Sequence, residues 1–316
     1  MATLRQLWVD PVLTNMSIGH HPQGMVARDV MPMVKVVKES GKYYVWNIGD
    51  ALRIPASRRA DGARANQIDF GLTNTSTYSC EEEALETKIT RRQRDNADSA
   101  VNLESSKVRR ITDLLNMRWE SDVATLLTTT GNYASTNTTT LSSTNQWNNA
   151  SFSGGATGAG IEGDIDAGKE AVRQNSGGYE PNVVVIPAAV AKVIKRDPAV
   201  RELIKYTQND LLVNGDLPPT LWGMKVVIPK VSNVTSLEGA TNVFADLWGK
   251  HVAMLYVPQS PAIDEPSFGY TFVSRDFQVQ RWNEPGTDSD FFSVGFIKDQ
   301  KVTSNVMGYL IESAIA

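Results

Sequence analysis

NADSAVNLESSKVRRITDLLNMRWESDVATLLTTT, residues 96–130, is the stretch around which the rest of the chain is organised. Its apolar residues recur at steps of three, four and seven, the spacing of one stripe along an α-helix. Neither Gly nor Pro interrupts the run before Gly131. The pattern predicts one helix over about 96–130, which spans roughly 50 Å at about 1.5 Å per residue. The stripe consists of Val101, Val108, Ile111, Leu115, Trp119, Val123 and Leu126.

This helix is longer than most helices of globular proteins, so we interpret it as a beam between distant contacts. An ordinary long core helix is one alternative, and half of a coiled coil is another. The coiled coil is the weaker alternative, because the apolar run covers less than four heptads and the chain has no matching second run.

Length and composition limit the class of protein. The 316 residues suffice for one large domain or two smaller ones. Cys80 is the only cysteine, so no disulfide within the chain stabilises it, and we expect a reducing compartment. The first residues, MATLRQLWVDPVL, lack the apolar core of a signal peptide. No run reaches the roughly 18 apolar residues of a membrane helix, so no membrane contact is expected.

The net charge of −4 argues against a protein that condenses DNA by neutralising its phosphates. It is compatible with a wall that encloses DNA. We therefore expect enclosed DNA to be held without specific binding.

The N-terminal 32 residues carry Pro11, Pro22 and Pro32 among apolar residues without a period. This pattern predicts an extended arm rather than part of a core. His20 and His21 are candidates for half of a metal site. The chain has only one other histidine and no Cys/His cluster, so we expect no metal ion.

Residues 33–80 read as a long two-stranded excursion. MVKVV, KYYVWNI and the returning IDFGLTNTSTYSC are rich in the β-branched and aromatic residues of strands. The tip between them is basic and rich in small residues, and an isolated hairpin is only marginally stable in water. We therefore expect the tip to rest on another chain. A mobile surface loop is the alternative. A loop that binds nucleic acid is disfavoured, because the tip has no aromatic residue on which a base could stack. The basic residues are Arg53, Arg58, Arg59 and Arg64.

An acidic cluster follows the excursion, just before the predicted helix. Charges of this kind most often mark a solvated face. Because the excursion is basic, we interpret the cluster as a surface that receives the arginine-rich tip of a neighbouring chain. The cluster consists of Glu81, Glu82, Glu83 and Glu86.

The remaining chain predicts an α+β organisation. Residues 128–159 are mostly Thr, Ser, Asn and Gly, which is typical of a linker or surface loop. From residue 161 the chain alternates between helical and strand patterns, and its last part is rich in strands. The predicted helices are IEGDIDAGKEAVRQNSG, AAVAKVIKR and AVRELIKYTQ; the predicted strands are PNVVVIP, WGMKVVIPK and VFADLWGKHVAMLYVP.

Two Gly-rich motifs suggest nucleotide binding, but their context does not support it. Gly158–Gly163 matches G-x-G-x-x-G, yet a polar loop rather than a strand precedes it. Gly163–Glu170 resembles a phosphate-binding loop, but Glu170 stands where Ser or Thr would bind Mg²⁺. Three histidines and one cysteine also leave few candidates for catalysis. We therefore expect no catalytic residue, no cofactor and no enzymatic activity.

The order of segments resembles the major capsid proteins of tailed bacteriophages with the Hong Kong 97-like fold. YSCEEEALETKITRRQRDNAD, which leads into the long helix, is similar to the entry of that family's spine helix. LWGMKVVIPK resembles a strand of its axial domain, and FGYTFVSRDFQVQRW and KVTSNVMGYLIESAI resemble its closing strands. The resemblance covers nearly the whole chain.

This resemblance implies a division into segments. Residues 1–32 would form an N-terminal arm and residues 33–80 an extended β-hairpin loop. Residues 81–159 and 261–316 would form a peripheral domain with the spine helix, and residues 160–260 an axial domain.

The resemblance also implies a function: self-assembly into hexamers and pentamers of an icosahedral shell that encloses phage double-stranded DNA. It implies a virion protein that assembles in the host cytoplasm with a separate scaffolding protein, a portal and possible decoration proteins. An encapsulin-like cellular nanocompartment is the main alternative, and a nucleotide-dependent enzyme is a further one.

Overall fold

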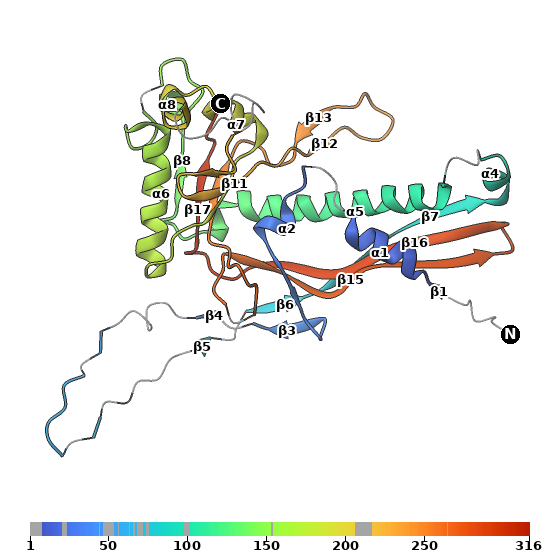
Figure 1. Ribbon diagram of the computed structural model, residues 1–316, viewed down its shortest axis with the longest axis horizontal. Coiled ribbons are helices and arrows are strands. Elements are labelled where there is room, and N and C mark those ends of the chain that lie inside the picture. Colours follow the sequence, from blue (N-terminus) through green and yellow to red (C-terminus); the bar gives the residue numbers. More distant parts are fainter. Residues whose placement is uncertain are drawn as a thin grey trace.

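The chain is an elongated molecule in which one long helix, α5 (Leu103–Thr128), joins two β-sheets (Figure 1). The computed structural model describes residues 8–20, 24–43, 45–46, 54–55, 57–62, 64–65, 67, 72–73, 76–97, 102–152, 154–205, 217–263 and 265–316. Helices and strands together give the expected α+β class.

The first sheet is built on a long antiparallel hairpin of β15 (Gly269–Glu284) and β16 (Ser289–Val302). The acidic strand β7 (Glu81–Thr90) extends β16 and forms an edge of the sheet. On the other side of the hairpin, β1 (Trp8–Val9) and β2 (Met33–Lys35) pair with different parts of β15. Apolar residues of β15 and β16 form a buried cluster with α5 and α1 (Pro11–Gly19), so both helices cover one face of this sheet.

The second sheet has six strands in the order β10-β11-β9-β14-β17-β8. Its core strands are apolar; β9 reads Val-Val-Val and all three side chains are buried. One face packs against the C-terminal half of α5, and the other against α6 (Gly160–Ser176) and α7 (Ala188–Ile194). The strands are β8 (Thr138–Thr140), β9 (Val183–Val185), β10 (Thr220–Leu221), β11 (Met224–Val227), β14 (Val252–Leu255) and β17 (Gly308–Glu312).

The long helix bridges the two sheets because its apolar stripe faces both. Val108, Ile111 and Leu115 are buried against the first sheet, whereas Trp119 and Val123 are buried against the second. The predicted beam is confirmed, but the helix begins at Leu103 rather than near residue 96. Asn102 caps it by accepting the backbone N–H of Ser105 at 3.2 Å. The short helix α4 (Arg91–Asp95) precedes it, with a capping box between Thr90 and Gln93.

The expectation of an extended N-terminal arm is wrong for the described residues before Met33. Asp10 accepts the N–H groups of Val12 and Leu13 and so starts α1, with Pro11 in the first turn. The short helix α2 (Ala27–Val30) follows, and Ala27 and Val30 are buried in the core. This part of the chain is therefore packed on its own subunit.

The excursion pairs as a hairpin at its base. β3 (Ser40–Lys42) pairs antiparallel with β6 (Thr77–Ser79), and β4 (Val45–Trp46) with β5 (Leu72–Thr73). Beyond these pairs the described residues extend far from the body (Figure 1).

The second sheet includes strands from outside residues 160–260, the range expected for the axial domain. β8 lies before residue 160 and β17 after residue 260, yet both pair in the second sheet with β14 and β9. Residues 128–159 are more than a surface loop, because Tyr133, Leu141 and Trp147 are buried. Boundaries drawn from the order of segments therefore do not follow the sheets.

A second projection was not predicted. β12 (Ser232–Val234) and β13 (Phe244–Asp246) form a two-stranded hairpin that leaves the body on the side of α5 opposite the excursion (Figure 1). We call residues 232–246 the ribbon. The remaining short helix, α8 (Pro198–Lys205), follows α7.

Candidate functional site

The tip of the excursion is exposed and basic. Arg58, Arg59 and Arg64 are exposed, and Arg53 lies outside the described residues. Ile54, near the start of the tip, is 98% exposed. The base of the excursion is firmly held: the Tyr78 ring stacks on Phe272 at 4.7 Å between centroids, and Tyr43 lies 5.5 Å from the same ring. A fixed base and an uncovered tip make this segment suited to contact outside its own subunit.

The acidic strand β7 places its glutamates on two sides. Glu81, Glu82 and Glu86 are exposed, whereas Glu83 turns toward α5 and is half-buried. Burial and the nearby Asp122 raise the pKa of Glu83. Glu82 also lies 3.9 Å from Arg275. Three of the four predicted glutamates are thus available at a free sheet edge.

The structure does not bring the basic tip and the acidic strand together within one subunit. The tip projects away from the body, whereas Glu81–Glu86 begin β7 directly after β6, at the base of the excursion (Figure 1), and no ion pair joins the two in the part of the chain that the structure describes. The prediction that they meet between subunits is therefore not tested by a single chain.

A buried glutamate that the sequence analysis missed joins three segments. Glu120 on α5 is fully buried, and its carboxylate accepts the backbone N–H groups of Val26 and Ala27 at 2.8–3.0 Å. It also accepts the indole N–H of Trp248 at 2.8 Å. Burial raises the pKa of Glu120, and these hydrogen bonds oppose the rise. The only sequence signal for this role is the place of Glu120 directly beside the apolar stripe.

A buried lysine, also missed, lies between α5 and the first sheet. Lys298 on β16 is 7% exposed, and its Nζ lies 3.4 Å from the ring centroid of Phe296 and 3.7 Å from that of Trp119. Its Nζ has no hydrogen-bond partner among the described residues. Burial lowers the pKa of Lys298 to about 6. The charges that act on it come from Glu83, Arg28, Asp276 and Asp122.

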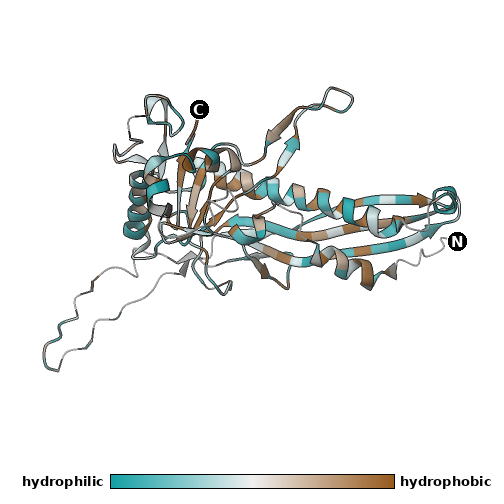
Figure 2. Cartoon of the chain, turned by 45° about the horizontal axis from the view of Figure 1, so that its top comes forward, coloured by the Kyte–Doolittle hydropathy of each residue, from teal (hydrophilic) through white to brown (hydrophobic). Residues whose placement is uncertain are grey.

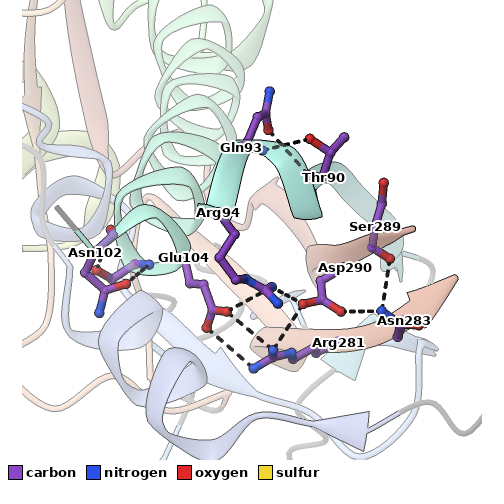
Figure 3. Close-up of polar contacts among 10 residues, drawn as sticks. Thr90, Gln93, Arg94, Asn102, Glu104, Arg281, Asn283, Ser289 and Asp290 are labelled. Carbon is purple, nitrogen blue, oxygen red and sulfur yellow. Dashed lines mark hydrogen bonds and ion pairs between the residues drawn. The ribbon is translucent and has the colours of Figure 1, made fainter. Parts of the chain in front are cut away.

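A polar cluster closes the far end of the first sheet (Figure 3). Asp290 of β16 is bound by Arg94 of α4, by Arg281 of β15 at 3.4 Å and by Asn283 at 2.7 Å. Glu104, in the first turn of α5, lies 3.3 Å from Arg281 and 3.5 Å from Arg94. Burial would raise the pKa of Asp290, but the hydrogen bonds from Arg94 and Asn283 lower it overall. This cluster fixes the start of α5 on the sheet.

The Gly-rich region has a structural role. The carboxylate of Asp164 accepts the indole N–H of Trp147 at 3.0 Å and the backbone N–H of Thr157 at 3.0 Å, which folds the loop back on α6. Lys169 donates to the carbonyl of Trp222 at 3.0 Å. These side chains are therefore engaged within the chain rather than arranged around a phosphate.

Neither a metal site nor a membrane-spanning helix is found among the described residues. They contain no group of three or more His, Cys, Asp or Glu placed to hold a metal ion. None of the helices described is both long and apolar enough to cross a membrane. The described residues expose two projections, the excursion and the ribbon, and the acidic strand β7.

Comparison with known proteins gives a consistent result. A family model described as "Phage capsid protein" matches residues 75–294. The chain is 32% identical over 272 residues to the major capsid protein of Burkholderia phage BcepMu, covering 83% of this chain and 82% of that protein.

Two solved structures share the fold. The chain superposes with a TM-score of 0.76 on a phage-related protein from Bordetella bronchiseptica RB50, at 24% identity and 99% coverage of both chains. It superposes with a TM-score of 0.61 on the capsid protein of cyanophage P-SCSP1u, at 11% identity and with coverage of 89% and 85%.

Proposed function

This chain belongs to the phage capsid protein family, and we propose from this premise that its copies assemble into the closed shell of a phage head. It has the Hong Kong 97-like fold, and its function is that of a major capsid protein. Its role is structural. The observation that carries the proposal is the 32% identity with a phage major capsid protein over most of both chains.

The finer assembly follows from the two exposed surfaces. We propose hexamers and pentamers in which the excursion of residues 33–80 reaches over a neighbouring subunit. There Arg58 and Arg59 approach the exposed glutamates of β7. Such a contact joins two different patches of identical chains, and it generates a ring when the rotation between neighbours closes.

The segments take the family's roles in this proposal. Residues 33–80 are the extended loop, α5 with the first sheet is the peripheral domain, and the second sheet with α6 to α8 is the axial domain. The described residues before Met33 are a packed segment rather than a free arm.

The shell encloses double-stranded DNA without specific binding in this proposal. The net charge of −4 supports this, because a wall of this charge does not neutralise phosphates. The proposal also includes assembly in the host cytoplasm. A separate scaffolding protein, a portal and possible decoration proteins are the partners.

Electron microscopy of the purified protein tests the proposal. We expect rings, sheets or closed shells. A strictly monomeric protein at every concentration and ionic strength would overturn it. Analysis of the particle contents separates a phage head from an encapsulin-like compartment, since the first encloses DNA and the second a cargo enzyme.

A further inference from the structure

The ribbon is a surface that its own subunit leaves uncovered. Every residue from 232 to 246 is described, and none of their side chains is buried. Val234 lies directly opposite Phe244, and these side chains are 47% and 68% exposed. The only charged residues of the ribbon are Glu238 and Asp246, so the ribbon is acidic as well as apolar. A two-stranded hairpin with no core is marginal in water, so this one needs a partner to cover its apolar pair.

The base of the ribbon is fixed. Lys230 donates its backbone N–H to the carbonyl of Gly24 at 3.1 Å, and Leu247 donates to that of Val231 at 3.1 Å. From this base the ribbon projects away from the body (Figure 2). The surface that covers its apolar pair therefore belongs to another molecule.

The outer face of α5 carries a row of side chains that complements the ribbon. All of α5 is described, and Leu114, 54% exposed, is its only exposed large apolar side chain. Arg110 lies about one turn before Leu114 and is exposed, and Met117 lies almost one turn after it and is half-buried. Arg110 forms no ion pair with the described residues, so its charge is available to another chain.

The carboxylates beside this row are already engaged within the subunit. Asp113 Oδ1 lies 2.7 Å from His20 Nε2, and Asp122 Oδ1 lies 3.3 Å from a guanidinium nitrogen of Arg118. Arg109, the neighbour of Arg110, is also exposed. A carboxylate that approaches Arg110 from outside therefore meets a positive surface, and the acidic ribbon matches it in charge.

The ribbon and the row also match in spacing along their lengths. Phe244 and Asp246 are two residues apart on one strand, so they point to the same side about 6.8 Å apart. Leu114 and Arg110 are four residues apart on a helix, which rises about 6 Å over that length. A ribbon that lies along α5 with Phe244 on Leu114 therefore brings Asp246 to Arg110.

The spacing across the ribbon agrees as well. Val234 lies opposite Phe244, where side chains of paired strands are about 5 Å apart. Met117 is three residues from Leu114, and residues at this spacing on a helix are about 5–6 Å apart. The apolar pair of the ribbon can therefore cover Leu114 and Met117 together.

We propose that the ribbon of one subunit lies along the outer face of α5 in a second copy of this chain. Phe244 packs on Leu114, and Asp246 accepts hydrogen bonds from Arg110. A second copy is the partner because this chain itself supplies both surfaces with opposite charge and equal spacing. The inference rests on the proposed function, because it requires copies in contact.

Carbodiimide cross-linking of assembled particles tests this contact. Arg110→Lys keeps the positive charge and supplies an amine that the reagent can join directly to the carboxylate of Asp246. Particles assembled from equal amounts of ¹⁴N- and ¹⁵N-labelled Arg110→Lys protein should yield a mixed-label peptide that links Asp246 of one copy to position 110 of another. Thr125→Lys, at an exposed position about 22 Å further along the same helix, is the matched control. Its cross-link to Asp246 should be at least tenfold weaker.

The outcomes separate the two proposals. If the unmodified protein forms no particles, the proposed function fails. If particles form but the mixed-label peptide is absent, the ribbon contact is wrong and the shell remains. The same holds if Asp246 is joined only within its own chain or to a different protein.

The apolar part of the contact gives a second readout, which needs no change on α5. Phe244→Ser should lower the yield of particles at least threefold. Val243→Ser is the matched control, because Val243 is 56% exposed and successive side chains of a strand point to opposite faces. Neither side chain is buried, so both variants should unfold at the same urea concentration as the unmodified protein. Equal particle yields from the two variants would contradict the proposed contact.

Discussion

The carboxylate of Glu120 accepts the indole N–H of Trp248 at 2.8 Å, although 127 residues separate them in the sequence. The same carboxylate accepts the backbone N–H groups of Val26 and Ala27. One buried side chain thus ties the spine helix to α2 and to the base of the ribbon.

We predict that Glu120→Ala lowers the free energy of unfolding of the unassembled subunit by about 3 kcal/mol or more, because it leaves three buried N–H groups without an acceptor. Glu120→Gln keeps one acceptor oxygen and should cost less. Urea denaturation measures both. Glu86→Ala, at an exposed position on β7, is the control and should change stability by less than about 0.5 kcal/mol. Equal losses for Glu120→Ala and the control would refute the role of Glu120.

The pKa of Lys298, lowered by burial to about 6, predicts a pH dependence of stability. In the unfolded chain the amine binds its proton up to about pH 10.4, so between these values the unfolded state binds more protons and stability rises with pH. The contribution approaches 1.4 kcal/mol per pH unit at the middle of this window. Lys298→Met should remove this slope and raise stability at pH 7.

Urea denaturation of both proteins between pH 6 and pH 9 measures the effect of Lys298 within that window. Lys88→Met, at an exposed position of the first sheet, is the matched control and should keep the slope of the unmodified protein. A Lys298→Met variant with an unchanged slope would show that the amine stays protonated in the folded state.

Asp290→Asn should lower the free energy of unfolding by about 2 kcal/mol at pH 7, because it weakens charge-assisted hydrogen bonds to Arg94 and Arg281. The pKa of Asp290 is lowered in the folded protein, so its contribution is present above about pH 4 and is lost as pH falls through the folded value. The difference between the two proteins should therefore shrink below about pH 4. Thermal unfolding across this range measures it, and a difference that stays constant would contradict it.

Reversing the charges at the excursion tip should impair assembly. The double variant Arg58→Glu with Arg59→Glu would place like charges against the exposed glutamates of β7. In the unmodified protein each exposed ion pair contributes only about 0–1 kcal/mol. Repetition over a shell multiplies the effect, so particle yield should fall most at low salt, where screening is weakest. Light scattering and electron microscopy measure the yield.

A second set of substitutions, which makes the charges of β7 complementary to the altered tip, is the control for this contact. Adding Glu81→Arg and Glu82→Arg to the double variant should recover the yield if these residues meet between subunits. An unchanged yield and salt dependence in the double variant would refute the contact.

The sequence predicted the long helix because Leu115, Trp119 and Val123 repeat with the period of a helix and are all buried. It did not predict where the helix begins. Residues before Leu103 lack Gly and Pro, and only the capping of Asn102, a three-dimensional arrangement, sets the start. Periodicity locates the middle of a helix better than its ends.

The N-terminal helices were missed because Pro11 was interpreted as a breaker. At the first position of a helix, proline costs no hydrogen bond, and the preceding Asp10 caps the helix. Glu120 and Lys298 were missed because charged residues are normally exposed, and only tertiary contacts bury them. β13 lies within the predicted strand segment VFADLWGKHVAMLYVP, but β12 and its pairing with β13 were missed because β12 is short and carries no clear alternation of apolar and polar residues.

The ladder between β15 and β16 is regular at both ends but shifts register twice, between Val273 and Arg275 and between Arg275 and Gln278. Extra residues of this kind interrupt the hydrogen bonds of a sheet and let it bend locally. Phe277 and Phe296 lie at the second shift, and their buried rings pack edge to face 5.1 Å apart in the core against α5. The bend of the long hairpin is therefore coupled to the position of α5, because the side chains at the bend belong to the core that holds this helix.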